Sequence, residues 1–194
     1  MEQPKIKLAE TVIIIDAAHY NFVTSDLRRY FENRLNRKLA DIEIIRLVSD
    51  LALEAGIRQG ENEIQLLWVY DDQSAKLENS VPADLKIELN GVAFKNLLGE
   101  FASAGVPCSG MVTREDLFLD LLNITADSAD VKRIVLFPND HEYTKKVHKA
   151  IENIKEKEII IFKIGERKDE PASCKIANAL FPLLHAYGIQ ADEL

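Results

Sequence analysis

Cysteine is scarce in this 194-residue chain, with Cys108 and Cys174 as the two examples. Their wide separation excludes a short-spaced zinc knuckle and a disulfide framework, so reduced thiols of a cytoplasmic protein are expected. No apolar run approaches the roughly 20 residues that a membrane-spanning helix needs, and the first residues lack the apolar centre of a signal peptide. We therefore expect no membrane partner. The segment after Gly188 fits either the end of the protein or the entry to a further domain.

Positively charged residues are fewer than negatively charged ones. The chain has 24 Lys and Arg and 32 Asp and Glu, which gives a formal net charge of -8. This balance excludes broad, non-specific coating of nucleic acid, which depends on neutralising phosphates with Lys and Arg. A nuclease is still allowed, since part of the negative charge can belong to a metal site. There is no Gly-rich phosphate loop and no Asp-x-Asp at the first strand, which argues against a phosphatase-like or nucleotide-binding protein.

What the chain does have is an alternation of apolar strands and amphipathic helices. This predicts an α/β fold with a doubly wound, mainly parallel sheet, arranged as a Rossmann-like three-layer sandwich. No linker is long enough to divide it, so we expect one domain over residues 1–194, with a core at about 10–165. The predicted strands are 11–15, 64–70, 106–112, 132–137 and 158–164, with an added edge strand at 85–89. The first predicted helix begins at about Ser25, and the later helices cover about 41–55, 92–104, 116–126, 141–154 and 173–187. The last helix has a kink at Pro182 and follows a charged loop at 165–171.

Four acidic residues stand where predicted strands pass into loops or helices: Asp16, Asp116, Asp140 and Glu142. In an open parallel sheet these loops converge on one crevice. Carboxylates gathered there repel one another and are costly unless they hold a cation. The pattern therefore predicts a Mg²⁺ or Mn²⁺ site. Each residue also has a plainer interpretation, as a turn former, an N-cap or, at Thr113-x-x-Asp116, a capping box. Asp71 and Asp72 either join the cluster or begin a loop.

The order of these motifs resembles the NYN domain, a branch of the PIN-like metal-dependent ribonucleases that includes LabA-like proteins. The likeness covers roughly residues 10 to 185. The family's Asp-Gly-x-Asn reads here as Asp16-Ala-Ala-His19, and its Lys-Gly-x-Asp reads as Thr113-Arg-Glu-Asp116. Its Ser-Gly-Asp-x-Asp-Phe reads as Pro138-Asn-Asp140-His-Glu142-Tyr143, and its later Ser-x-x-Leu as Ser173-Cys-Lys-Ile176. His19, Thr113 and the Pro138-Asn139 pair depart from the family pattern.

The resemblance implies a PIN-like fold and a metal-dependent endoribonuclease that cleaves RNA phosphodiesters, with single-stranded RNA as the expected partner. One or two Mg²⁺ or Mn²⁺ ions would orient a water for in-line attack. The catalytic and metal-binding residues would be Asp16, Asp116, Asp140 and Glu142, and the substrate-binding candidates are His19, Asn21, Asn139 and His141.

The alternative is a catalytically weakened NYN-fold module that binds RNA or a protein partner. Tyr20 and Phe22, if exposed, would offer faces on which the bases of a single strand can stack, and as core residues they need no function. Unliganded carboxylates would repel one another, so Asp16→Asn or Asp140→Asn would raise stability. A homodimer and a monomer are both compatible with the apolar stripes of the predicted helices.

Overall fold

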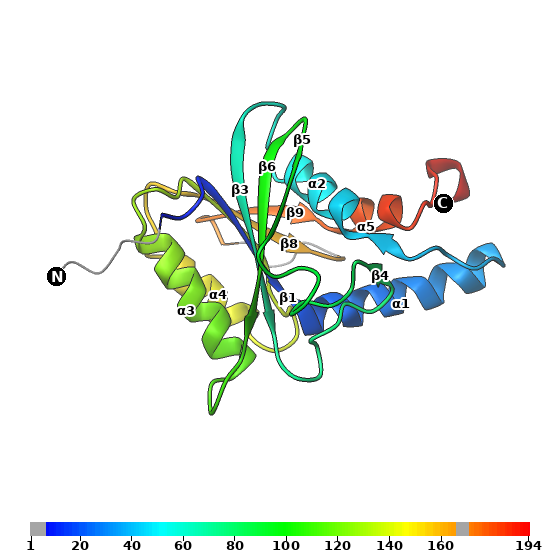
Figure 1. Ribbon diagram of the computed structural model, residues 1–194, viewed down its shortest axis with the longest axis horizontal. Coiled ribbons are helices and arrows are strands. Elements are labelled where there is room, and N and C mark those ends of the chain that lie inside the picture. Colours follow the sequence, from blue (N-terminus) through cyan, green and yellow to red (C-terminus); the bar gives the residue numbers. More distant parts are fainter. Residues whose placement is uncertain (1–6, 166–170) are drawn as a thin grey trace.

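A mostly parallel, seven-stranded sheet forms the middle layer of the molecule (Figure 1). The computed structural model describes residues 7–165 and 171–194. The strand order is β5-β6-β3-β1-β7-β8-β9, and of the neighbouring pairs only β5 and β6 run antiparallel. The strands are β1 (Thr11–Asp16), β3 (Asn62–Tyr70), β5 (Val92–Asn96), β6 (Gly99–Pro107), β7 (Arg133–Phe137), β8 (Glu158–Lys163) and β9 (Lys175–Asn178). A separate small sheet pairs β2 (Ile42–Glu43) with β4 (Ser80–Val81).

Helices cover both faces of the large sheet, which confirms the predicted α/β class and is compatible with a three-layer sandwich (Figure 1). One layer holds α3 (Arg114–Asp127) and α4 (Thr144–Ile151). The other holds α1 (Ala17–Leu35), α2 (Ile44–Glu54) and α5 (Leu180–Ala186), and a short 3₁₀ helix, Ala191–Glu193, follows.

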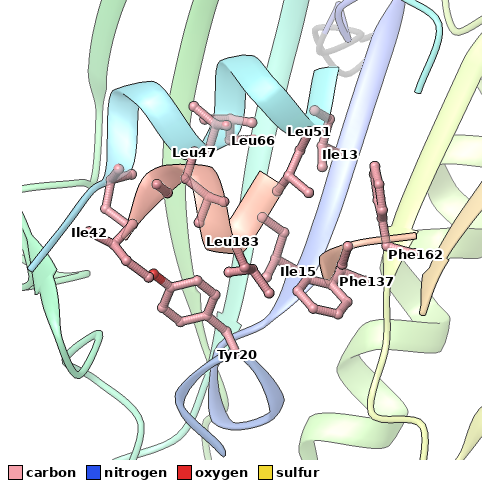
Figure 2. Close-up of a cluster of buried hydrophobic side chains, with 14 of the residues drawn as sticks. Ile13, Ile15, Tyr20, Ile42, Leu47, Leu51, Leu66, Phe137, Phe162 and Leu183 are labelled. Atoms are coloured by element: carbon pink, nitrogen blue, oxygen red, sulfur yellow. The ribbon is translucent and has the colours of Figure 1, made fainter. Parts of the chain in front are cut away.

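The central strand β1 explains why the sheet needs a helix layer on each side. All six of its residues are buried, and successive side chains of a strand point to opposite faces. Ile13 and Ile15 enter the core under α2 and α5, where they meet Leu47 and Leu183 (Figure 2). Ile14 enters the second core, under α3 and α4. A continuous β-branched run is the pattern of a strand buried on both faces.

The helix predicted at 92–104 is wrong, because this segment forms the β5–β6 hairpin. Its apolar residues match the helical spacing, yet Phe94 and Phe101 lie opposite each other on the two strands, with ring centroids 4.7 Å apart. Gly99 has a φ of 136°, and an added Cβ would overlap the backbone of Asn62 on the neighbouring strand. The turn thus needs glycine, and a helix would bury neither phenylalanine against this sheet edge.

Four other predicted elements also need correction. The third core strand is β6, which ends at Pro107, so the strand at 106–112 is wrong for most of its length. The segment 85–89 is not a strand; the N–H groups of Glu88 and Leu89 bond back to the carbonyl of Asp84. The first helix begins at Ala17, not near Ser25.

The last predicted helix, 173–187, divides into strand β9 and helix α5. Pro182 lies in the first turn of α5, where a helical N–H has no partner to lose, so it causes no kink. The predicted loop at 165–171 falls largely on residues 166–170, outside the described residues. The remaining strands and helices are confirmed apart from their end residues.

The hairpin turn gives a first testable expectation. Gly99→Ala should lower the free energy of unfolding by roughly 2–5 kcal/mol, because the added methyl group overlaps the Asn62 backbone and φ is unfavourable. Gly110→Ala is the matched control, since Gly110 also has a positive φ but has open space around it. Urea unfolding measures both variants. Equal losses in the two would show that φ alone, and not the close approach of β3, requires glycine.

Candidate functional site

The direction in which the chain winds through the sheet reverses at β1. From β1 the chain proceeds outward to β3 and β6, and it then returns to β7 on the other side of β1 and proceeds to β8 and β9. A crevice is expected outside the carboxyl ends of the strands at such a reversal. Here it is bordered by Asp16 at the end of β1 and by residues 138–143, which lead from β7 into α4, at the lower edge of the sheet in Figure 1.

The centre of this crevice is occupied by the guanidinium group of Arg114, the first residue of α3. Its Nη1 atom donates to both carboxylate oxygens of Asp16, at 2.9 and 2.8 Å. Its Nε donates to Oδ2 of Asp71 at 2.8 Å, and its Nη2 lies 3.4 Å from Oε2 of Glu142. Burial lowers the pKa of Arg114, but Asp16, Asp71 and Glu142 outweigh that effect and raise it. The guanidinium is therefore a permanent cation between three carboxylates.

Asp16 has no oxygen left over for another cation. It is fully buried, and besides the two bonds from Arg114 its Oδ1 accepts the backbone N–H of His19 at 2.9 Å. Its Oδ2 accepts the hydroxyl of Tyr143 at 2.5 Å. Burial, reinforced by the charge of Asp16, raises the pKa of Tyr143, so the hydroxyl keeps its proton and acts as a donor. Asp16 is also the N-cap of α1, as one of the two sequence interpretations predicted.

The other predicted metal ligands have separate partners. Asp116 forms a capping box with Thr113 and is exposed, so its plainer interpretation is the one that the structure bears out. Asp140 accepts the Thr144 hydroxyl at 3.2 Å, and burial raises its pKa. Of the four predicted acids, the contacts join only Asp16 and Glu142, and they do so through Arg114.

Within residues 7–165 and 171–194, no group of three or more His, Cys, Asp or Glu side chains is arranged to hold a metal ion. The donor set around Asp16 does not fit Mg²⁺ or Mn²⁺ while Arg114 keeps its bonds, because hard cations need free oxygen atoms.

Beside Arg114 lies a hollow whose walls are aromatic. His19 from α1 stands edge-on to Phe137, with ring centroids 5.4 Å apart, and 6.2 Å from the ring of His141. Phe22, which is 59% exposed, stands edge-on to His141 at 5.7 Å. Two neighbouring concavities share the side chains of His19, Phe22 and His141. One extends to Asn139, Glu142 and Arg114, and the other to Asp140 and Ile164. We call the space formed by His19, Phe22, Asp140 and His141 the aromatic hollow.

His19 is the unusual member of the aromatic hollow. It is 3% exposed, and neither ring nitrogen has a hydrogen-bond partner among the described residues. Burial lowers its pKa to about 4; Asp16 acts in the opposite direction, whereas His141 and Arg114 lower the pKa further. The ring is therefore neutral near pH 7, with one donor and one acceptor nitrogen.

The two asparagine candidates hold loops in place. Asn21 donates to the carbonyl of Lys76 and accepts the N–H of Glu78, both at 2.8 Å, so it fixes the segment before β4. Asn139 accepts the N–H groups of His141 and Glu142, which shapes the turn before α4. Asp71 fits both of its interpretations, because Oδ1 closes a turn with Ser74 while Oδ2 meets Arg114.

Sequence reasoning missed two residues, Arg114 and Tyr143, as parts of this site. A signal for each was present: Arg114 lies inside the Thr113–Asp116 motif, and Tyr143 occupies the aromatic position of the motif after β7. Neither motif indicates that Arg114 or Tyr143 would bond to Asp16. These contacts join residues that are 98 positions apart in the sequence for Arg114 and 127 for Tyr143.

Fold and site together define an α/β protein with a charged crevice at the winding reversal of a parallel sheet. The chain belongs to the family described as "Family of unknown function (DUF6621)", which matches residues 5–194. Neither the comparison with curated proteins nor that with solved structures gave a match. Among the described residues, no helix combines the length and apolar character needed to cross a membrane.

Asp16→Asn should destabilise the protein, contrary to the expectation of relief from carboxylate repulsion. It leaves a largely buried guanidinium without its main counter-charge, which costs about 3–5 kcal/mol. Glu142→Gln is the control from the same network; its side chain is half-exposed and its loss should cost at most about 1 kcal/mol. Urea unfolding compares the two. An Asp16→Asn variant as stable as the natural protein would disprove the importance of the ion pair.

His19 gives a pH-dependent contribution of definite sign. The unfolded chain takes up a proton near pH 6.5, whereas folded His19 remains neutral until about pH 4. The unfolded state thus binds more protons in this window, and stability should fall by up to about 3 kcal/mol as the pH drops from 7 to 4. His19→Gln should flatten this part of the profile, as measured by urea unfolding at a series of pH values. An unchanged slope would assign the effect to other groups.

Proposed function

We propose that this protein is a non-hydrolytic module with an NYN-like fold that binds single-stranded RNA at the carboxyl edge of its sheet. The observation that carries the first part is the position of Arg114. Its guanidinium group bonds to Asp16, Asp71 and Glu142, and so supplies from within the chain the positive charge that clustered carboxylates need. The proposal places this module in the cytoplasm.

The aromatic hollow supports the second part of the proposal. Phe22 and His141 present exposed ring surface beside the crevice, and base–aromatic stacking contributes about 1–3 kcal/mol per base. The surrounding charge is acidic, with Asp140 and Glu142 at the hollow and -8 over the whole chain. Affinity in this proposal therefore comes from the bases more than from phosphate contacts.

A second candidate is the metal-dependent endoribonuclease that the NYN resemblance implies. One observation favours it: three carboxylates from separate elements converge on a single positive group. Arg114 would first have to leave these carboxylates, and the buried ion pair to Asp16 opposes that movement. No catalytic step can be derived from the arrangement that has Arg114 in place.

Metal titration separates the two candidates. Mg²⁺ or Mn²⁺ should leave the melting temperature of the natural protein unchanged. Arg114→Ala should unfold more easily without metal and gain roughly 1.4–2.7 kcal/mol at 10- to 100-fold excess over Kd, because the freed carboxylates can bind the ion. The double variant Arg114→Ala/Asp16→Asn is the control and should lose that gain. Strong stabilisation of the natural protein by either ion would favour the nuclease instead.

RNA binding and RNA cleavage are tested on the same samples. Labelled single-stranded RNA should bind the natural protein and remain intact in the presence of Mg²⁺ or Mn²⁺, as followed by fluorescence anisotropy and gel electrophoresis. Cleavage that requires the metal and disappears in Asp16→Asn would overturn the non-hydrolytic proposal. Absence of any RNA binding would overturn the proposed partner.

A further inference from the structure

We propose that the aromatic hollow accepts one unpaired nucleobase and prefers bases that carry an exocyclic amino group, namely adenine, cytosine and guanine, over uracil. This inference rests on the proposed function for its ligand, the RNA strand. It goes beyond that function because it assigns a base-recognition site and a specificity to side chains outside the Arg114 ion-pair network: His19, Phe22, Asp140 and His141.

The aromatic hollow has the shape of a corner between two rings. Phe22 projects from α1 and is 59% exposed, and His141 is exposed on the loop before α4. Their rings stand at 83° to each other, so they form two walls of a corner with the ring of His19 at its inner side. A flat heterocycle that enters this corner can lie against one ring face and meet the edge of the other, the two arrangements that aromatic rings prefer.

The ring nitrogens of buried His19 are the polar atoms with which a base edge can pair. Buried polar groups in folded proteins almost always have hydrogen-bond partners, and leaving them without one is costly. Within residues 7–165 and 171–194, neither nitrogen of His19 has a partner, although the side chain contributes to both concavities. Because the nitrogens have almost no solvent contact, the exposed His141 ring must shift before a ligand edge can reach them, and Phe22 then remains as the wall against which the base lies. A base edge, which carries donors and acceptors side by side, can then complete the pairing of a histidine nitrogen.

Asp140 sets the preference of the hollow among the bases. Asp140 lines the hollow, and one of its carboxylate oxygens accepts the Thr144 hydroxyl. The other oxygen has no hydrogen-bond partner among the described residues, and an ionised carboxylate only accepts. It can therefore accept a hydrogen bond from a ligand donor. The amino groups of adenine, cytosine and guanine are such donors, whereas uracil has only its ring N3–H, flanked on both sides by carbonyl oxygens that a carboxylate repels.

The charge around the hollow indicates why the base, and not the phosphate, enters. Asp26, Asp140 and Glu142 line its two concavities. The cation beside them, Arg114, already has three carboxylate partners. Asp26 is paired with Arg29 and Glu142 with Arg114, so a phosphate would be repelled mainly by Asp140, while a neutral base would not.

Fluorescence anisotropy with labelled oligoadenylate, oligocytidylate and oligouridylate of equal length tests the specificity. Oligoadenylate and oligocytidylate should bind at least about fivefold more tightly than oligouridylate, and Phe22→Ala should weaken all three by at least about fivefold. Phe181→Ala is the matched control, since Phe181 is 61% exposed on α5 and distant in sequence from the hollow; it should change nothing. Asp140→Ala should reduce the tighter affinities to that of oligouridylate.

The outcomes separate this inference from the proposed function. If RNA binds but Phe22→Ala has no effect, or if all three oligonucleotides bind equally, the base site is disproved while RNA binding stands. If no oligonucleotide binds but adenosine saturates the protein in NMR titrations and Phe22→Ala abolishes this, the base site stands and RNA is not the partner. Failure of both adenosine and RNA to bind overturns both. His19→Gln should weaken the binding of every ligand. If that variant does not fold, Phe22→Ala and Asp140→Ala still test the base site.

Discussion

The ion pair between Arg114 and Asp16 is the constraint on which the crevice depends. Asp16 is fully buried at the end of the central strand, and the Arg114 side chain is 17% exposed. Taking both charges from water is expensive, and the cost is recovered only when the geometry is good and the remaining lone pairs are satisfied. Here they are satisfied, by two bonds from Arg114, by the Tyr143 hydroxyl and by the His19 N–H. One carboxylate therefore links β1, α1, α3 and the segment before α4.

The start of α3 determines where the positive charge lies. Thr113 and Asp116 form a reciprocal capping box, which fixes the first turn of the helix and with it the position of Arg114. The NYN resemblance assigns a metal-binding role to Asp116 of this motif. In the structure the motif supplies a cation to the crevice, through Arg114, while its acid stabilises the helix end. Through Arg114, this motif thus places an internal positive charge among the carboxylates at the end of β1.

The sequence predicted the layers of this fold well, because runs such as 11–15 and 158–164 are buried on both faces and carry a clear pattern. It failed at 92–104, where the apolar spacing also fits a helix and the hairpin depends on contacts with distant residues, such as the pairing of β6 with β3 and the close approach of Gly99 to Asn62. For the site, strand ends predicted that Asp16 and Glu142 would lie near one another. The sequence could not predict that a guanidinium would join them, because that depends on how a side chain 98 residues from Asp16 is oriented.

The ion pair also determines what the aromatic hollow can bind. The charge of Asp16 favours protonation of His19, and burial, His141 and Arg114 oppose it. Burial is the largest of these effects on the pKa of His19 and keeps the ring neutral, and Arg114 acts in the same direction. A neutral imidazole both donates and accepts, so it suits an uncharged ligand edge, whereas a charged imidazolium would only donate and would attract anions. Removing Arg114 would leave the charge of Asp16 without its counter-charge and favour protonation of His19, so the ion pair adds to the effect of burial from outside the walls of the hollow.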